Sequence, residues 1–198
     1  MPASSITADK NVCPTGNRAV PQPTIEALLE LDQFTSRIPL EALADWLSRT
    51  DITIDLVRPF LRFSSDHYVR NLMYAGPSYQ ALVLCWQSGQ RSPIHDHRGS
   101  SCAVRIVSGI ATETTFAQAA NGMFYATGSR ELTAGDSCAS QDADVHQMSN
   151  LQPAGVDLVT LHIYSPPLFR MNMYSLVDAK VKQFFDPVNE EFFSGAGI

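Results

Sequence analysis

The sequence predicts a mainly β domain, an antiparallel sandwich or small barrel, that follows a cap of short helices. Its apolar residues recur at helical spacing up to about residue 66 and at a strand period of two beyond Tyr68. The strand-like runs are short and closely spaced, with Gly and Pro between them. Because no helical segments alternate with these runs, an antiparallel arrangement is favoured over a parallel sheet.

The helical cap is predicted for residues 24–66. Apolar residues recur there three or four positions apart, in three groups: Ile25, Leu28, Leu29 and Leu31; Leu40, Leu43, Trp46 and Leu47; and Leu56, Val57, Phe60 and Leu61. This spacing places apolar side chains on one face of each helix, so we expect the helices to pack on the β domain. Residues 1–23 are rich in Pro, Ser, Thr, Asn and Gly, and we predict a flexible leader there.

The β-barrel is predicted for residues 67–198. Four runs are rich in apolar, β-branched and aromatic residues, namely 81–86, 102–107, 123–127 and 156–164. A chain of 198 residues is long enough for one sizeable core. We therefore expect residues 24–198 to fold as a single domain.

Composition excludes several classes of partner. The chain has 14 basic and 20 acidic residues, a formal net charge of −6 and no run of Lys or Arg, so neither nucleic acid nor a membrane is an expected partner. No apolar stretch approaches the ~18 residues of a membrane span, and the amino terminus lacks a secretory pattern. We expect a cytoplasmic protein, a monomer, whose four scattered cysteines are free thiols.

His95-Asp96-His97 is the most informative motif of the chain. Residues i and i+2 of a strand point to the same side, so these two imidazoles can bind one metal ion, and His146 offers a third from a later strand. Uncharged nitrogen donors suit divalent iron, copper, nickel or zinc better than calcium or magnesium. An isolated His-x-His is more often a solvated loop or a hydrogen-bonded core pair, so the neighbouring residues decide its interpretation.

The residues around the histidines form two spaced patterns. Residues 89–109 read G-x5-H-x-H-x4-C-x6-G, and residues 146–150 read H-x3-N. Together they resemble the two cupin motifs, with Cys102 in the place where most cupins have a metal-binding Glu. Without that carboxylate, three neutral imidazoles leave the full +2 charge on a metal, and such a centre attracts an anionic ligand such as a thiolate.

Further short segments occur in order between residues 68 and 167. They are Tyr68-Val69-Arg70-Asn71-Leu72, Leu84-Cys85-Trp86, Ile94-His95-Asp96-His97, Cys102, His146 with Asn150, and Leu161-His162-Ile163-Tyr164-Ser165-Pro166-Pro167. This combination closely resembles the cysteine dioxygenase family of thiol dioxygenases. The resemblance implies a cupin-type barrel or jelly roll, with Fe(2+) held by His95, His97 and His146. It also implies that Arg70 binds the substrate carboxylate, which suits a planar guanidinium, with Tyr68 beside it in the pocket.

The resemblance assigns roles to one predicted strand as well. Thr160, His162 and Tyr164 alternate and therefore share a face. The resemblance implies that Tyr164 is catalytic and is oriented by His162, with Thr160 in place of the family's usual Ser. Cys102 matches a cysteine that forms a thioether with this tyrosine in some members, so we expect the link to form with incomplete occupancy. The Ser–Pro bond that corresponds to Ser165–Pro166 is cis in the family, and a cis bond here would shape the pocket beside Tyr164. Without the resemblance, His162 is a core histidine and Cys102 a small buried apolar residue.

The resemblance implies one reaction. L-Cysteine would bind the iron through its thiolate and amine, and both atoms of dioxygen would end on sulfur, giving cysteine sulfinic acid. An Arg at position 70 favours cysteine, since related 3-mercaptopropionate dioxygenases tend to carry Gln there. Two alternatives stay open: a dioxygenase of another small thiol such as 3-mercaptopropionate, and a cupin that binds a metal without catalysis, because fold alone does not establish function. An isomerase-type cupin with zinc or manganese usually needs the Glu that Cys102 replaces.

Overall fold

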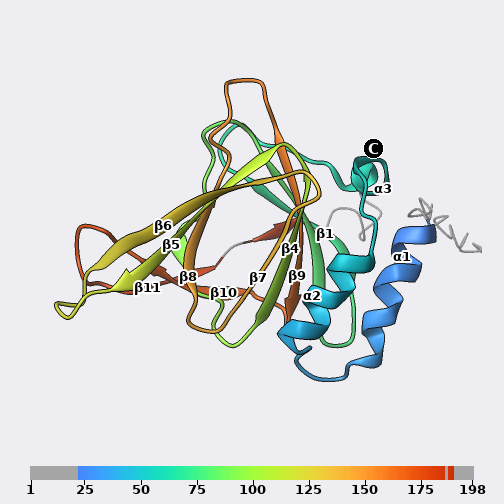
Figure 1. Ribbon diagram of the computed structural model, residues 1–198, viewed down its shortest axis with the longest axis horizontal. Helices are drawn as coiled ribbons and strands as arrows, with labels where there is room; N and C mark the ends of the chain where they lie inside the picture. The colour runs from blue at the N-terminus through green and yellow to red at the C-terminus, as the bar shows by residue number, and fades with distance from the viewer. Residues whose placement is uncertain (1–21, 186, 190–198) are drawn as a thin grey trace, which may run out of the picture.

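Short helices precede a two-sheet barrel in the computed structural model, which describes residues 22–185 and 187–189 (Figure 1). The helices are α1 (Gln22–Leu29), η1 (Glu30–Gln33), α2 (Leu40–Arg49), α3 (Ile54–Val57) and η2 (Arg58–Phe60), where η marks a 3-10 helix. The predicted leader, residues 1–23, lies outside the described residues except for Gln22 and Pro23, which begin α1. None of the described helices has the length and apolar character needed to cross a membrane.

Twelve strands form the barrel in the part of the chain that is described. They are β1 (Val69–Ala75), β2 (Gln80–Trp86), β3 (Ile94–His95), β4 (Ser101–Ser108), β5 (Ile110–Gln118), β6 (Phe124–Thr133), β7 (Ser137–Gln141), β8 (Val145–Ser149), β9 (Leu158–Ser165), β10 (Arg170–Tyr174), β11 (Lys182–Phe185) and β12 (Val188–Asn189). They make two six-stranded sheets, in the orders β12-β1-β2-β9-β4-β7 and β11-β10-β3-β8-β5-β6. All pairs are antiparallel except β1 with β12. The predicted mainly β, cupin-type fold is confirmed.

The centre of the first sheet, formed by β2 and β9, is buried on both faces, which explains the apolar runs there. Alternate residues of β2 belong to different clusters: Ala81, Val83 and Cys85 pack with the helices, and Leu82, Leu84 and Trp86 pack inside the barrel. Its neighbour β9 is buried along its whole length. A strand covered on both sides needs apolar residues at successive positions, so these two strands were predictable without a period of two.

The helices cover the outer face of the first sheet (Figure 1). Helix α2 buries Leu43, Trp46 and Leu47 on one side, and the indole Nε1 of Trp46 donates a hydrogen bond of 2.8 Å to the carbonyl oxygen of Ala27. The predicted third helix is short, because the ring of Pro59 has no N–H to continue an α-helical ladder. The cap is therefore part of the main core.

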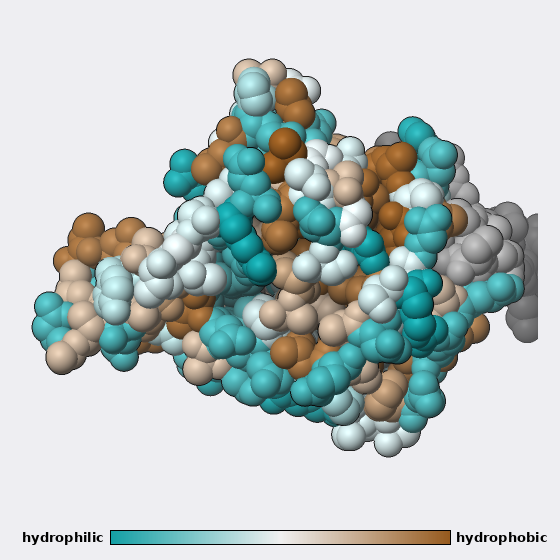
Figure 2. All heavy atoms as spheres, in the orientation of Figure 1, coloured by the Kyte–Doolittle hydropathy of each residue, from teal (hydrophilic) through white to brown (hydrophobic). Residues whose placement is uncertain are grey.

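The second sheet extends beyond the barrel as an arm made by β5, β6, β10 and β11 (Figure 1). Strand β6 was predicted from its aromatic residues, yet most of it is exposed. Strand β5 was not predicted, because its Thr-rich sequence lacks an apolar run. Apolar side chains gather at the end of the arm (Figure 2), where Leu176, Val177 and Val181 are exposed in the loop after β10.

The burial of the cap residues predicts a stability difference between two leucines. Leu43→Ala should lower the free energy of unfolding by about 2–5 kcal/mol, because the side chain is fully buried under the sheet. Leu29→Ala, in α1, is the matched control, since Leu29 is 47% exposed and its loss should cost less than about 0.5 kcal/mol. Urea unfolding measures both, and equal losses would contradict a cap that shares the core.

Candidate active site

Three histidines meet inside the barrel, at the point where β3 pairs with β8. His95 lies directly opposite His146 in this pair, and His97 follows two residues after His95. One nitrogen from each ring lies within 4.8 Å of the others, and all three residues are buried. Among the described residues, this is the one group of three or more His, Cys, Asp or Glu side chains that could hold a metal ion. The structure thus brings together the three ligands that the sequence predicted.

Two of the rings are held in the orientation that a metal ligand needs. The Nδ1–H of His95 donates to the carbonyl oxygen of Pro93 at 2.9 Å, and the Nδ1–H of His146 donates to Glu113 Oε1 at the same distance. In a neutral ring this leaves Nε2 unprotonated and available to a metal. Burial, helped by neighbouring positive charge, lowers the pKa of His95 to about 3, so its ring is neutral.

His97 is less fully satisfied than the other two. Its Nδ1 makes no hydrogen bond of good geometry within the described chain, and its Nε2 lies 3.4 Å from Ser140 Oγ, a long contact. Burial and the neighbouring histidines lower the pKa of His97 well below its ordinary value. A buried neutral imidazole whose nitrogens lack good hydrogen bonds can bind a divalent metal. No carboxylate belongs to the group of possible ligands.

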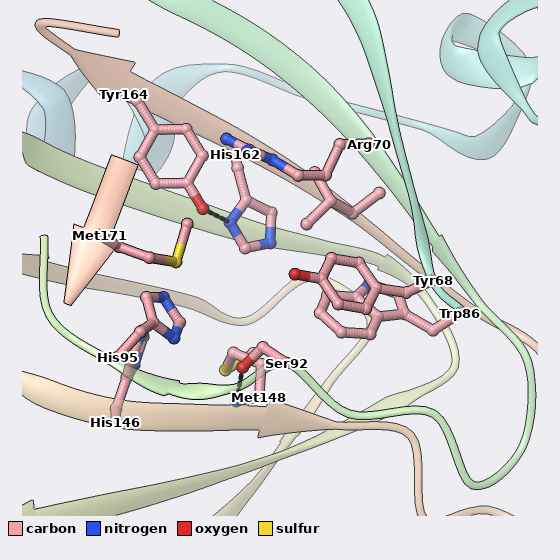
Figure 3. A pocket seen from close by; sticks show the side chains of 11 residues that line it. Tyr68, Arg70, Trp86, Ser92, His95, His146, Met148, His162, Tyr164 and Met171 are labelled. Atoms are coloured by element: carbon pink, nitrogen blue, oxygen red, sulfur yellow. Dashed lines mark hydrogen bonds between the residues drawn. The ribbon is translucent and has the colours of Figure 1, made fainter. Parts of the chain in front are cut away.

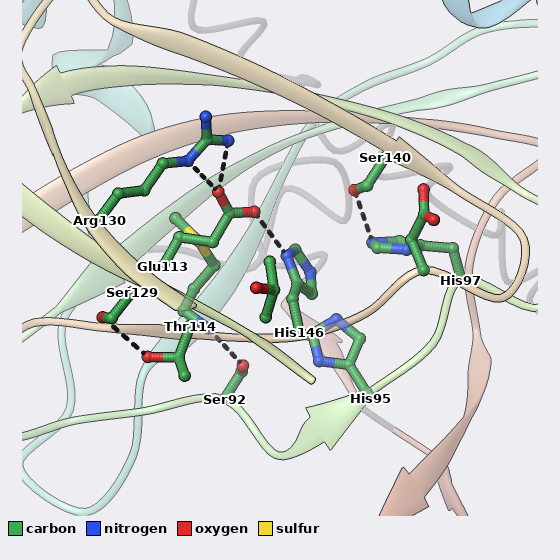
Figure 4. A network of polar contacts seen from close by, with 12 residues as sticks. Ser92, His95, His97, Glu113, Thr114, Ser129, Arg130, Ser140 and His146 are labelled. Atoms are coloured by element: carbon green, nitrogen blue, oxygen red, sulfur yellow. Dashed lines mark hydrogen bonds and ion pairs between the residues drawn. The ribbon is translucent and has the colours of Figure 1, made fainter. Parts of the chain in front are cut away.

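A carboxylate lies one contact further out, and the sequence analysis did not identify it. Glu113 on β5 is buried, and while Oε1 accepts from His146, Oε2 accepts from Arg130 Nε at 2.7 Å and pairs with its Nη2 at 2.6 Å (Figure 4). Burial raises the pKa of Glu113, but the hydrogen bonds and charges of His146 and Arg130 outweigh it and the pKa is lowered. The carboxylate is therefore ionised. Only the β5–β8 register, which no local pattern encodes, could have revealed this contact.

Asp96, between two of the ligands, holds the motif in place. Its carboxylate accepts hydrogen bonds from the backbone N–H of Asn172 at 2.9 Å, the Asn172 Nδ2 at 2.7 Å and the hydroxyl of Tyr174 at 2.8 Å. These bonds tie the end of β3 to β10. The Asp96 side chain is engaged by β10, which explains why the motif has a buried acid between two histidines without adding a ligand.

A small pocket opens beside the histidines (Figure 3). Its lining residues are Tyr68, Arg70, Leu84, Trp86, Ser92, His95, His146, Met148, His162, Tyr164 and Met171. Arg70, on β1, is buried and donates from Nη2 to the carbonyl oxygen of Leu168 at 3.0 Å, with its guanidinium 5.5 Å from the centre of the Tyr164 ring. The ring of Tyr68 stacks on Trp86 at 4.2 Å between centroids. A buried cation and two of the three grouped histidines, His95 and His146, therefore line the same cavity.

Two of the residues that alternate along β9, His162 and Tyr164, also line this pocket. His162 lies between its two neighbours, with Nδ1 3.0 Å from the Tyr164 hydroxyl and Nε2 2.9 Å from Thr160 Oγ1. Cys102, on β4, is the direct cross-strand partner of Tyr164. Burial raises the pKa of the Cys102 thiol far above its ordinary value. The Ser165–Pro166 bond at the end of this strand is cis, as expected.

Comparison with known proteins agrees with this geometry. The family model described as "Cysteine dioxygenase type I" matches residues 30–176, which is more than half of the chain. The chain belongs to the cysteine dioxygenase type I family. The match includes every residue named in the pocket and in the histidine group, and it confirms the family that the sequence motifs indicated.

Individual relatives of this cysteine dioxygenase family member match over a shorter stretch. The cysteine dioxygenases type 1 of Bos taurus and Homo sapiens are each 32% identical over 117 residues, which cover 54% of this chain and 56% of theirs. The chain thus spans about half the length of the curated relatives it matches. Among solved structures, TT1209 from Thermus thermophilus has a TM-score of 0.48 and 13% identity, covering 56% of this chain and 94% of that one.

The Glu113 contact predicts how the site holds a metal. Glu113→Gln keeps the size and an acceptor oxygen but removes the negative charge that faces the Nδ1–H of His146. We expect the affinity for a divalent metal to fall by about 10–100-fold, measured by competition with a chelator.

The control is Glu131→Gln, an exposed residue on the adjacent strand β6. It should leave the affinity unchanged. If Glu113→Gln binds metal as tightly as this control, the carboxylate does not support the ligand.

Proposed function

We propose that the protein is an iron(II)-dependent cysteine dioxygenase, which adds both atoms of dioxygen to the thiolate of L-cysteine and gives cysteine sulfinic acid. One observation carries the proposal: three buried imidazoles come together without a carboxylate ligand, and two of them line a small pocket that also contains a buried guanidinium. Membership of the cysteine dioxygenase type I family supports it. The substrate, the metal and the reaction itself are parts of the proposal.

His95, His97 and His146 would hold the Fe(2+) ion. Their donor set is uncharged, so an anionic thiolate is a better ligand for such a centre than for one with a carboxylate. When bound, the iron supplies a redox-active Lewis acid that favours a thiolate substrate and activates dioxygen. The chain's own residues then select, orient and enclose the substrate.

Arg70 would bind the carboxylate of the substrate. The guanidinium presents five N–H donors in a plane, of which the contact with the Leu168 carbonyl engages one nitrogen. Because the group is buried, its charge acts on an anion with little screening by water. A planar pair of donors can engage both carboxylate oxygens and so fix the direction in which the thiol points.

Tyr164 would act on the substrate from beside Arg70. Its ring lies under the Arg70 guanidinium, and its hydroxyl is hydrogen-bonded to His162, so the phenol is fixed near the position of the substrate carboxylate. Thr160 in turn holds His162. All three side chains are buried, and the enclosed pocket limits the access of bulk water to the reacting thiolate.

Loading the protein anaerobically with Fe(2+) and then supplying L-cysteine and oxygen tests the reaction directly. We expect oxygen uptake with formation of cysteine sulfinic acid, detected by mass. Arg70→Gln should raise the KM for cysteine by roughly 10–100-fold, as expected for a lost charge-assisted hydrogen bond, with little change in iron content.

The exposed Arg58→Gln serves as its control and should leave both quantities unchanged. Equal losses of iron and of cysteine affinity in Arg70→Gln would contradict the role assigned to Arg70. Uptake that is faster on 3-mercaptopropionate than on cysteine would favour the alternative thiol.

A thioether between Cys102 and Tyr164 is the second part of the proposal. The two residues face each other across the β4–β9 pair, and both are buried in the same apolar cluster. Forming the bond removes one hydrogen from the thiol and one from the ring, so an oxidant is required, and dioxygen would supply it. We expect incomplete linkage.

Peptide mass analysis after aerobic turnover measures this link. A fraction of the protein should yield a cross-linked peptide that is lighter by two hydrogen atoms than its two free parts together, and Cys102→Ser should abolish it. Cys138→Ser is the control, because Cys138 lies opposite Val104 rather than Tyr164. Free Cys102 and unmodified Tyr164 throughout would rule out the link.

A further inference from the structure

Four buried side chains form a continuous hydrogen-bonded chain that extends the row on β9 into the neighbouring strand β2. The indole Nε1 of Trp86 donates to Thr160 Oγ1 at 3.0 Å. The same hydroxyl lies 2.9 Å from His162 Nε2, and His162 Nδ1 lies 3.0 Å from the Tyr164 hydroxyl. Each of the four residues is less than 5% exposed, so bulk water does not reach them. Figure 3 shows three of them, Trp86, His162 and Tyr164.

The first bond of this chain has only one possible direction. An indole nitrogen donates and cannot accept, so Thr160 Oγ1 accepts from Trp86. Across the described residues, the hydrogen bonds of this hydroxyl are those with Trp86 and with His162. The hydroxyl proton of Thr160 therefore has the Nε2 of His162 as its acceptor.

The hydrogen bonds are donated in one direction, from Thr160 to the imidazole of His162 and from this imidazole to Tyr164. Burial, reinforced by the positive charge of Arg70, lowers the pKa of His162 well below its ordinary value, so the ring is neutral. A neutral imidazole carries a single N–H. Since Nε2 accepts, the proton lies on Nδ1, which donates to the oxygen of the Tyr164 hydroxyl.

The opposite direction leaves a buried group unsatisfied. If Tyr164 donated to Nδ1, the proton of His162 would lie on Nε2 and point at Thr160 Oγ1, which already accepts from Trp86. The Thr160 hydroxyl proton would then have no acceptor in a fully buried position, which is unfavourable.

We propose that Trp86 is a positioning residue that sets the direction of the chain, so that Tyr164 accepts from His162 and directs its own phenol proton away from His162. The consequence for catalysis rests on the proposed function: the Tyr164 hydroxyl would donate a hydrogen bond to the substrate or to dioxygen. Trp86 acts through Thr160 and His162. Its indole also stacks on Tyr68 and lines the pocket, which is a separate contribution.

The tautomer of His162 is the direct readout, and nuclear magnetic resonance of the metal-free protein labelled with ¹⁵N-histidine measures it. The chain has five histidines, and loss of one signal set in His162→Gln assigns the residue. We expect a protonated Nδ1 and an unprotonated Nε2 in the wild type. In Trp86→Phe the two nitrogen resonances should shift toward each other. Without the indole N–H, the Thr160 hydroxyl can turn toward the vacated space, where a water molecule can accept its proton, so Oγ1 can accept from Nε2–H and both tautomers become populated.

Three further variants separate direction from packing. Trp46→Phe removes the other indole N–H of the chain, which donates to Ala27 in the helical cap, and it should leave the His162 resonances unchanged. Thr160→Val should mix the tautomers as Trp86→Phe does, and Thr160→Ser, which restores the hydroxyl, should recover the wild-type tautomer. Wild-type His162 protonated on Nε2, or unchanged His162 resonances in Trp86→Phe, would overturn the proposal.

Oxygen uptake by the same variants, loaded with iron, separates this inference from the proposed function. Trp86→Phe should lower kcat for L-cysteine more than it changes KM, because Arg70, which binds the carboxylate, is left in place. If the wild type has the expected tautomer but consumes no oxygen with cysteine, the proposed function is wrong and the direction of the hydrogen bonds is still supported. If the wild type oxidises cysteine with His162 protonated on Nε2, the direction fails and the function stands.

Discussion

The site depends on one cross-strand pair, His95 opposite His146. The β3–β8 pairing places two imidazoles on the inner side of the second sheet, and the turn of chain after β3 brings His97 within reach of both. Hydrogen bonds hold this pair in place. Asp96 ties the motif to β10, and Pro93 and Glu113 each accept from the Nδ1–H of one ring. The geometry of the metal ligands is thus set by strand register rather than by a flexible loop.

Charge is distributed in a consistent way around this pair. The three imidazoles are buried, the carboxylate of Glu113 lies one contact away, and Arg130 balances its charge at the surface. On the pocket side, Arg70 supplies the positive charge that an anionic substrate needs. A metal held here keeps most of its own charge for the substrate, and burial makes each of these interactions stronger than it would be in water.

The sequence predicted those features that depend on local patterns or on matched motifs. The apolar runs of β2 and β9, the spacing of His95 and His97, and the alternation of Thr160, His162 and Tyr164 are properties of single segments. Glu113 and the Trp86–Thr160 bond depend on which strands are neighbours and in what register, and nothing within one segment encodes that information. Strand β5 was missed for the related reason that its outward Thr side chains carry no apolar pattern.

The central claim is that three neutral imidazoles, and no carboxylate of the chain, bind the metal. A crystal structure of the protein loaded with Fe(2+) under anaerobic conditions tests it most directly. The account predicts iron bound to one nitrogen each of His95, His97 and His146, with Glu113 still hydrogen-bonded to Nδ1 of His146. An oxygen atom of Glu113 or Asp96 bound to the iron, or one of the three rings turned away from it, would contradict the account.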